Sequence, residues 1–288
     1  MAYENLGESL LDYYPCRYGK SKLLFRGPRR KLDGDYIAFL GSTETYGKYI
    51  EVPYPDLTEQ LTGVRSVNFG CVNAGADVFL GDLTVLDACA AARLTVLQVM
   101  GAQNMSNRFY SVHPRRNDRF LRASALLQRI YREVDFTEFN FTRHLLTTLQ
   151  ALSDERFQLV RQELREAWIA RTRTILQKIG GDVVLLWLAD HSPDEEWNPE
   201  GIGSDPLFVD RGMLLELQPL VKDIVEVVPS ASAVAEGTDG MVYSPLEEPA
   251  AKELLSLGAH REAAEALARP MKKLLGRRRF VNRPPNDK

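Results

Sequence analysis

Three glycine-bearing segments of this chain carry residue types that suit acyl-transfer chemistry. The first is Gly41-Ser42-Thr43, the second ends in Gly70, and the third ends in Asn104. A Ser42 or Thr43 hydroxyl is a candidate nucleophile. The Gly70 backbone N–H and the Asn104 side-chain amide are the kinds of group that form an oxyanion hole, which stabilises charge developing on an acyl oxygen. The alternative for each segment alone is structural, because glycines end strands and Ser or Thr caps helices in any such fold.

An acyl-transfer site also needs a base, and the chain has four histidines. His191 directly follows an apolar run and is the best candidate for the base, with Asp190 or Asp239 orienting it. The alternative is a loop histidine that only faces solvent. We give His113 no role in catalysis, and we expect His144 to be structural.

A basic and aromatic stretch begins a few residues after Asn104. Arg108, Arg115 and Arg116 could fold back over the site and hold a carboxylate, sulfate or phosphate of a substrate. The alternative is a helix surface on which these arginines pair with acidic side chains. Asn73, in the loop that follows Gly70, is a further candidate substrate-binding residue.

The elements that must position these groups alternate regularly along the chain. Short apolar runs predict buried strands at 36–40, 66–69, 94–100, 182–189 and 224–228. Capping residues and apolar periodicity predict helices at 55–61, 82–93, 153–179, 212–222, 248–255 and 260–268. Such alternation predicts right-handed crossovers and a parallel sheet that binds ligands beyond the carboxyl ends of its strands. The loops after strands one to five should therefore meet at one edge of the sheet.

The order of these elements also predicts the domain organisation of the chain. Residues 1–35 form an N-terminal arm, 36–270 form one α/β domain, and 271–288 form a basic flexible tail. Within the domain, residues 105–152 lack a strand pattern and are predicted to form an inserted helical lid. A role of the tail in binding nucleic acid or membrane is the alternative to a simple solvated tail.

In combination, the three segments resemble the first three sequence blocks of the SGNH (GDSL-type) hydrolase superfamily. Its Gly-Asp-Ser-x-x-x-Gly block is similar to Gly41-Ser42-Thr43-Glu44-Thr45-Tyr46-Gly47, and its second block looks like Asn68-Phe69-Gly70. Its Gly-x-Asn-Asp block resembles Gly101-Ala102-Gln103-Asn104, offset by one residue. The resemblance covers residues 36–104 and 182–269. It implies a flavodoxin-like three-layer α/β/α fold with a five-stranded parallel sheet, here with a helical insertion after strand three.

The resemblance also implies residue roles, and the chain departs from two of them. The nucleophilic serine of the family falls on Thr43, a rarer nucleophile, and Ser42 could serve only if the loop is shifted by one residue. Gly70 and Asn104 would be the oxyanion donors. The Asp-x-x-His block matches Asp239-Gly240-Met241-Val242, with valine where the family has histidine. His260 belongs to a stretch that resembles the closing helix of the family, so no standard Ser-His-Asp triad can be assembled from the expected positions.

Three classes of function follow from this pattern. The first is an esterase or O-acetyltransferase that acts on a polar or anionic, glycan-like substrate. The second is a catalytically impaired protein of the SGNH fold that binds an anionic glycan or a protein partner. The third is group transfer from a nucleotide donor, such as sulfation. The absence of a G-x-G-x-x-G or G-x-x-x-x-G-K-[ST] motif argues against this third class.

Composition also indicates which classes of binding partner are expected. A net charge of −3 gives no global field for nucleic acid, and the apolar runs are shorter than the roughly 20 residues that span a bilayer. No basic region followed by an apolar run opens the chain, so a cytoplasmic location is predicted. The three cysteines form no C-x-x-C pair and are expected to be reduced and mostly buried. We predict no metal and no cofactor, and the oligomeric state is not indicated.

Overall fold

The computed structural model describes residues 11–195 and 201–276, and its centre is a five-stranded parallel sheet. The strands are β1 (Ile37–Leu40), β2 (Ser66–Asn68), β3 (Leu94–Gln98), β6 (Val183–Leu188) and β7 (Asp223–Val227). Their order across the sheet is β2-β1-β3-β6-β7. This is the flavodoxin-like order 2-1-3-4-5, and all five strands coincide with the predicted apolar runs.

The strands β1, β3 and β6 are buried on both faces, which explains their mainly apolar runs, whereas the edge strand β7 exposes Asp223 and Glu226. Ile37 and Phe39 of β1 pack into one apolar cluster, while Ala38 and Leu40 pack into the other. This split follows from the two-residue period of a strand, which sends successive side chains to opposite faces.

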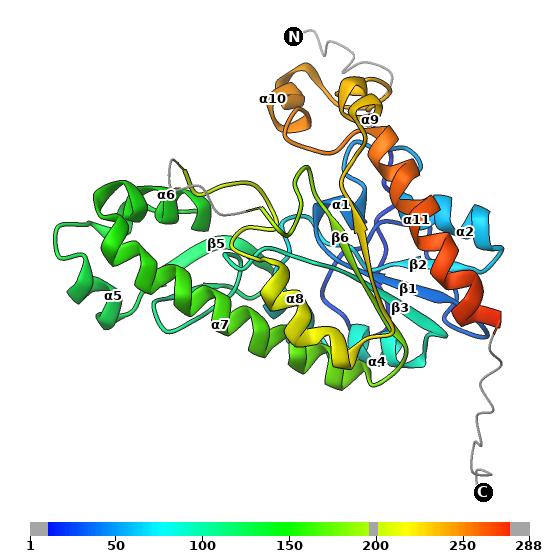
Figure 1. Cartoon of the computed structure of the whole chain (residues 1–288), viewed down its shortest axis with the longest axis horizontal. Coiled ribbons are helices and arrows are strands. Elements are labelled where there is room, and N and C mark those ends of the chain that lie inside the picture. Colours follow the sequence, from blue (N-terminus) through cyan, green and yellow to red (C-terminus); the bar gives the residue numbers. More distant parts are fainter. Residues whose placement is uncertain (1–10, 196–200, 277–288) are drawn as a thin grey trace, which may run out of the picture.

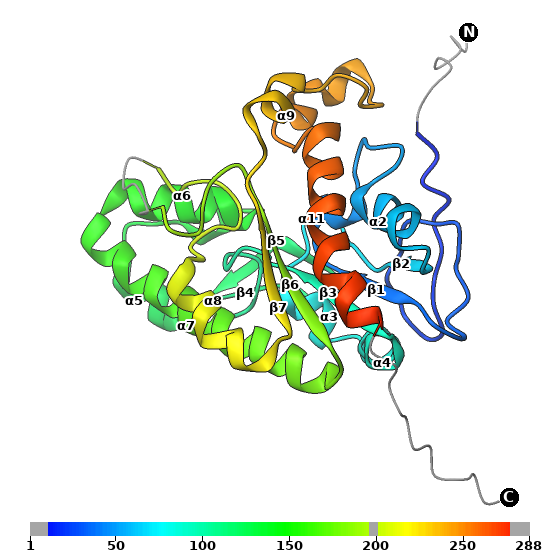
Figure 2. The ribbon, with the colours of Figure 1, turned by 45° about the vertical axis from the view of Figure 1, so that its right-hand side comes forward.

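Helices cover both faces and complete three layers (Figures 1 and 2). One layer contains α2 (Tyr54–Thr62) and α11 (Leu257–Gly276), which contact each other. The other contains α3 (Ala76–Leu80), α4 (Leu83–Ala91), α7 (Asp154–Ile179) and α8 (Arg211–Leu217). The long helix α7 begins where predicted, with the Ser153 hydroxyl accepting from the Arg156 N–H. It ends at Gly180, whose φ of 59° lies in the left-handed region that favours glycine.

The insertion after β3 projects from the end of the sheet, on the left in Figure 1. It contains α5 (Ala125–Ile130) and α6 (Thr142–Leu152), in keeping with the predicted helical character. It also contains an antiparallel hairpin that was not predicted, formed by β4 (Tyr110–His113) and β5 (Arg116–Ala123). The burial of β5 does not alternate regularly, and its pairing with β4 contains register shifts. Its arginines therefore do not follow the apolar–polar alternation that would have predicted a strand.

The predicted arm and tail lie partly within the described residues. Residues 11–35 pack on the domain: Tyr18 and Phe25 are buried against Phe69. Arg26 is also buried, and it donates to the Gly47 carbonyl at 2.6 Å, which ties the arm to the loop after β1. Residues 271–276 continue helix α11 rather than beginning a tail, and 277–288 lie outside the described residues.

Among the helices of residues 11–195 and 201–276, none has the length and apolar character needed to cross a membrane.

Candidate functional site

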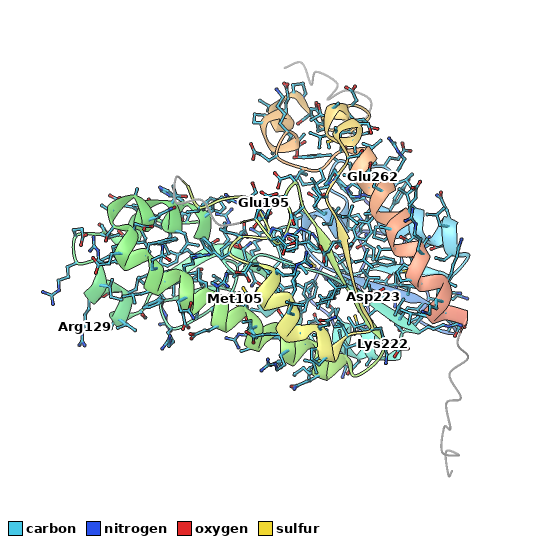
Figure 3. All side chains as sticks on the ribbon, in the orientation of Figure 1. Met105, Arg129, Glu195, Lys222, Asp223 and Glu262 are labelled. Atoms are coloured by element: carbon cyan, nitrogen blue, oxygen red, sulfur yellow. The ribbon has the colours of Figure 1, made fainter. Side chains whose placement is uncertain are left out.

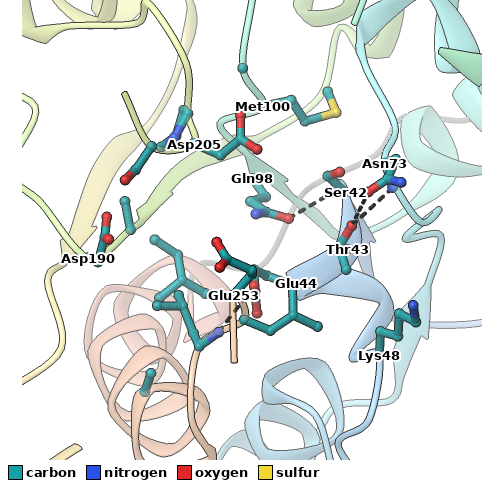
Figure 4. Close-up of a pocket in the computed structure, with 18 of the residues that line it drawn as sticks. Ser42, Thr43, Glu44, Lys48, Asn73, Gln98, Met100, Asp190, Asp205 and Glu253 are labelled. Atoms are coloured by element: carbon teal, nitrogen blue, oxygen red, sulfur yellow. Dashed lines mark hydrogen bonds between the residues drawn. The ribbon is translucent and has the colours of Figure 1, made fainter. Parts of the chain in front are cut away.

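A cavity of about 990 Å³ lies at the carboxyl edge of the sheet (Figure 4). The loops after β1, β2, β3, β6 and β7 all contribute to it, through Ser42, Asn73, Gly101, Asp190 and Pro229. The structure thus brings together the loops that were predicted to meet. Further walls come from α6 and from residues 234–259, which include the helices α9 (Ala231–Glu236) and α10 (Glu248–Ala251).

Gln98, the last residue of β3, fixes the start of the short helix α1 (Thr43–Tyr46). Its Oε1 accepts three hydrogen bonds: from the Ser42 N–H at 3.0 Å, the Thr45 N–H at 3.2 Å and the Thr45 hydroxyl at 2.6 Å. A Cβ on Gly41 would lie 2.1 Å from Thr45 Oγ1, so this turn accommodates only glycine. The candidate nucleophile loop is therefore held rigidly by a buried amide.

The two candidate nucleophiles differ in their surroundings. Thr43 Oγ1 accepts from the Asn73 N–H at 3.0 Å and donates to Asn73 Oδ1 at 3.2 Å. Asn73 has a φ of 55°, and its amide nitrogen donates to Asp118 of the hairpin at 3.3 Å. Thr43 therefore clamps the loop after β2. The Ser42 hydroxyl lines the cavity and has no hydrogen-bond partner within residues 11–195 and 201–276.

The two predicted oxyanion donors are already engaged. The Gly70 N–H donates to Asn68 Oδ1 at 2.8 Å, and Gly70 does not line the cavity. Asn104 does line it, but its Oδ1 accepts from the Thr142 hydroxyl at 2.7 Å and its Nδ2 donates to the Asn73 carbonyl at 3.2 Å. The Gly70 N–H is thus bonded outside the cavity, and its role as an oxyanion donor stays a prediction. Asn104 lines the cavity, and its side chain links α6 to the loop after β2.

His191 has no hydrogen bond to Ser42 or Thr43 among the described residues. Its Nδ1 lies 2.7 Å from Asp190 Oδ1, and its ring packs against Trp187 with the centroids 5.4 Å apart. Its side chain lines a second cavity of about 780 Å³, while Asp190 borders both cavities. The His191 hydrogen bond lowers the pKa of Asp190 below its usual range. Asp239 is exposed and lines neither cavity, whereas Asp190, the other predicted orienting residue, contacts His191. The role of His191 as a base stays a prediction.

The predicted substrate-binding arginines lie outside the cavity. Arg108 lies in the loop after β3 and contacts Glu163 of α7 through both its backbone and its side chain. Arg115 and Arg116 are exposed on the hairpin and do not line the cavity. Figure 3 shows Arg129 of the same insertion reaching into solvent. The insertion instead contributes Arg143 of α6, which donates to the Gly203 carbonyl at 2.9 Å and lies 3.6 Å from Asp205.

The cavity also contains charged residues that sequence reasoning missed. They are the carboxylates of Glu44, Asp205 and Glu253 and the amines of Lys48 and Lys252. Glu44 immediately follows the Ser-Thr pair, and this proximity was an available signal. Lys252 and Glu253 come from a segment that looks like an ordinary surface helix, and no local pattern marks them. Within the part of the chain that the structure describes, no group of three His, Cys, Asp or Glu side chains is arranged to hold a metal ion.

His260 is buried next to Glu44, a residue that lines the cavity. It is 1% exposed, its Nδ1 accepts from the Tyr54 N–H at 3.1 Å, and its Nε2 lies 3.3 Å from Glu44 Oε2. His260 lies in α11, which includes the helix predicted at 260–268. Its ring nevertheless lies directly behind a carboxylate of the cavity.

The fold and the site define a three-layer α/β/α protein with a polar, ligand-sized cavity at the carboxyl edge of a parallel sheet. The chain belongs to the protein family described as domain of unknown function (DUF6473), which matches residues 1–275. A comparison with curated proteins finds no match.

Among solved structures, the chain is similar to BT4096, described as a gut microbial diltiazem-metabolizing enzyme. The TM-score is 0.34 and the identity 12%, over 85% of this chain. The chain spans about half of that enzyme, 47% of its length. A similarity at this level carries no inference about the function of this chain.

Proposed function

We propose that this chain is a binding protein of SGNH-like ancestry whose edge cavity holds a polar, hydroxyl-bearing molecule, such as the terminal sugar of a glycan. The volume of about 990 Å³ lies within the range of small-molecule sites. The lining offers amide and carboxylate groups, from Asn73, Gln98 and Glu44 among others, next to apolar surface from Met100 and Leu255. A sugar presents the matching combination of hydroxyl groups and C–H faces.

The balance of charge favours a neutral ligand over a strongly anionic one. Four carboxylates line the cavity, on Glu44, Asp190, Asp205 and Glu253, against three cations, on Lys48, Arg143 and Lys252. Arg143 and Lys252 already face carboxylates, those of Asp205 and Glu248. Carboxylates accept strong charge-assisted hydrogen bonds from hydroxyl groups and repel anions.

One observation favours binding over catalysis: the groups that would perform acyl transfer have structural hydrogen bonds instead. Thr43 clamps Asn73, the Gly70 N–H is bonded to Asn68, and Asn104 bridges α6 to the loop after β2. None of the four histidines, all within the described residues, has a hydrogen bond to the Ser42 or Thr43 hydroxyl. This arrangement supports the catalytically impaired alternative.

The test is a thermal-shift screen against neutral and acidic monosaccharides and disaccharides. A sugar at 100 times its Kd should stabilise the chain by about 2.7 kcal/mol. Arg143→Ala should reduce the shift, because Arg143 lines the cavity, whereas Arg115→Ala should not, because Arg115 lies outside it. If no sugar in the panel raised the melting temperature, the proposal would be contradicted.

A second function, acyl-ester hydrolysis or O-acetyl transfer, is favoured by one specific observation. The Ser42 hydroxyl lies at the carboxyl end of β1, borders the cavity and is unpartnered among the described residues. Labelling of Ser42 by a fluorophosphonate, together with turnover of p-nitrophenyl acetate or an acetylated sugar, would support this function over simple binding. Absence of both would exclude it.

A further inference from the structure

Glu44 and His260 meet at the wall of the cavity, although neither belongs to the machinery that the sequence suggested. The Glu44 side chain is 16% exposed and lines the cavity, whereas the His260 side chain is 1% exposed and lies behind it. His260 Nε2 and Glu44 Oε2 are 3.3 Å apart. The second carboxylate oxygen, Oε1, accepts a long hydrogen bond of 3.4 Å from the Leu255 N–H. Figure 4 shows Glu44 on the cavity wall beside Glu253.

The hydrogen bonding fixes the tautomer of a neutral His260. The Tyr54 N–H donates to Nδ1 at 3.1 Å, so Nδ1 is the acceptor and carries no proton. The ring proton must then be on Nε2, the nitrogen that faces Glu44. A histidine in this state donates toward the carboxylate.

The pair is close but incompletely aligned. Among the described residues, His260 Nε2 is a buried polar atom whose geometry toward Glu44 falls short of a hydrogen bond. A buried donor without a partner destabilises the folded chain, so its retention calls for an explanation. Site hydrogen bonds that are long without ligand often tighten when the ligand binds.

We propose that Glu44 and His260 form a hydroxyl-recognising dyad. Glu44 accepts a hydrogen bond from a hydroxyl group of the ligand, and His260 Nε2–H holds the carboxylate in place from behind. A carboxylate has about four acceptor positions, so the contacts with His260 and Leu255 leave capacity toward the cavity. The dyad thereby specifies the ligand class: the bound molecule presents a free alcohol at this point.

This inference rests on the proposed binding function and adds a specificity to it. An analogue whose hydroxyl is deleted or converted to a methyl ether cannot donate to Glu44, and it leaves a desolvated carboxylate unpaired. Both kinds of analogue should therefore bind more weakly than the parent sugar at one ring position only.

The first test needs no ligand. Side-chain ¹⁵N–¹H NMR of the full chain, with His260 assigned by loss of its signals in His260→Gln, reports which ring nitrogen carries the proton. The dyad predicts the Nε2–H tautomer and a change in the Nε2 signal in Glu44→Gln. A proton on Nδ1 would overturn the proposal.

The second test is a double-mutant cycle, in which Glu44 is changed in the protein and one hydroxyl group is changed in the ligand. The probes are methyl hexopyranosides and their monodeoxy and mono-O-methyl derivatives. Loss of one charge-assisted hydrogen bond should weaken binding by about 10- to 100-fold, in Glu44→Gln and equally with the deoxy probe. The two changes together should cost no more than either alone. Glu265→Gln, an exposed glutamate on α11, is the matched control and should bind like wild type.

The outcomes separate the dyad from the function on which it rests. Probes that bind wild type and Glu44→Gln equally well would overturn the dyad and leave the binding function intact. Fully additive losses in the cycle would also overturn it, because Glu44 and the hydroxyl would then act independently. Probes that bind neither protein would overturn both proposals.

Discussion

Replacing Gln98 with leucine should loosen the loop that carries Ser42 and Thr43. The leucine keeps the apolar volume but removes an oxygen that accepts three hydrogen bonds. The Thr45 hydroxyl keeps a second partner, because it also lies 2.7 Å from the Tyr54 hydroxyl. The Ser42 and Thr45 backbone N–H groups keep none, since no other acceptor for them is found in the described structure.

An unsatisfied buried donor such as the Thr45 N–H costs about 1–3 kcal/mol, and the partly buried Ser42 N–H costs less, so the two together cost about 2–4 kcal/mol. Burial of the extra apolar surface of leucine offsets part of this loss, since the Gln98 side chain is already almost fully buried. We therefore expect Gln98→Leu to lower the free energy of unfolding by about 3 kcal/mol and to weaken sugar binding in the cavity.

Equilibrium urea denaturation measures the first effect directly. Gln162→Leu, on the exposed surface of α7, is the matched control and should change stability by less than about 0.5 kcal/mol. Thr45→Val, made alone and together with Gln98→Leu, tests whether the lost hydrogen bonds cause the destabilisation. The losses in the free energy of unfolding should be less than additive, because the two side chains share a hydrogen bond. A Gln98→Leu protein within about 0.5 kcal/mol of wild type would refute the role assigned to Gln98.

Three further predictions concern sterics, pH and ligand contacts. Gly75→Ala places a Cβ 1.6 Å from the Asn104 carbonyl oxygen, so it should destabilise the chain by more than about 3 kcal/mol in urea, whereas Gly201→Ala, in open space, should not. Burial raises the pKa of the Cys89 thiol from its ordinary 9.0 to about 12, so the unfolded chain binds fewer protons in that window and stability falls as pH rises through it. Cys89→Ala should remove up to about 1.4 kcal/mol of this loss per pH unit between pH 9 and 11, and parallel pH profiles of the two proteins would contradict it. In calorimetric titrations with the best sugar of the screen, Arg143→Ala should weaken binding and Arg116→Ala should not; equal effects would disprove the assigned lining.

The sheet could be predicted from the sequence because burial on both faces demands unbroken apolar runs. The runs at 36–40, 94–100 and 182–189 admit few other interpretations, and alternation with helices then fixes their parallel direction. The location of the cavity followed from the same rule, since the loops after the strands must meet at one edge.

The hairpin and the contents of the cavity could not be predicted in this way. Strand β5 reads Arg-Asn-Asp-Arg-Phe-Leu-Arg-Ala, and its polarity masks the pairing that places Asn117 in a fully buried position. There the Asn117 side chain accepts from the Gly75 and Val78 N–H groups, a contact that no local pattern announces.

The pairing of Glu44 with His260 is a consequence of tertiary structure. Each residue belongs to a different helix, and only the packing of α11 over the edge of the sheet brings the two side chains together. The bonding of the Gly70 N–H is local instead: its residue type fits an oxyanion hole, but the Asn68 side chain, two residues earlier, accepts from it.

The most direct measurement of the central claim is amide hydrogen–deuterium exchange, with and without the strongest sugar of the screen at saturation. We expect slower exchange in residues 41–48, 71–75 and 249–256, which border the cavity, and no change in the hairpin at 110–123. Protection confined to the hairpin, or to any surface that does not line the cavity, would contradict a binding site at the carboxyl edge of the sheet.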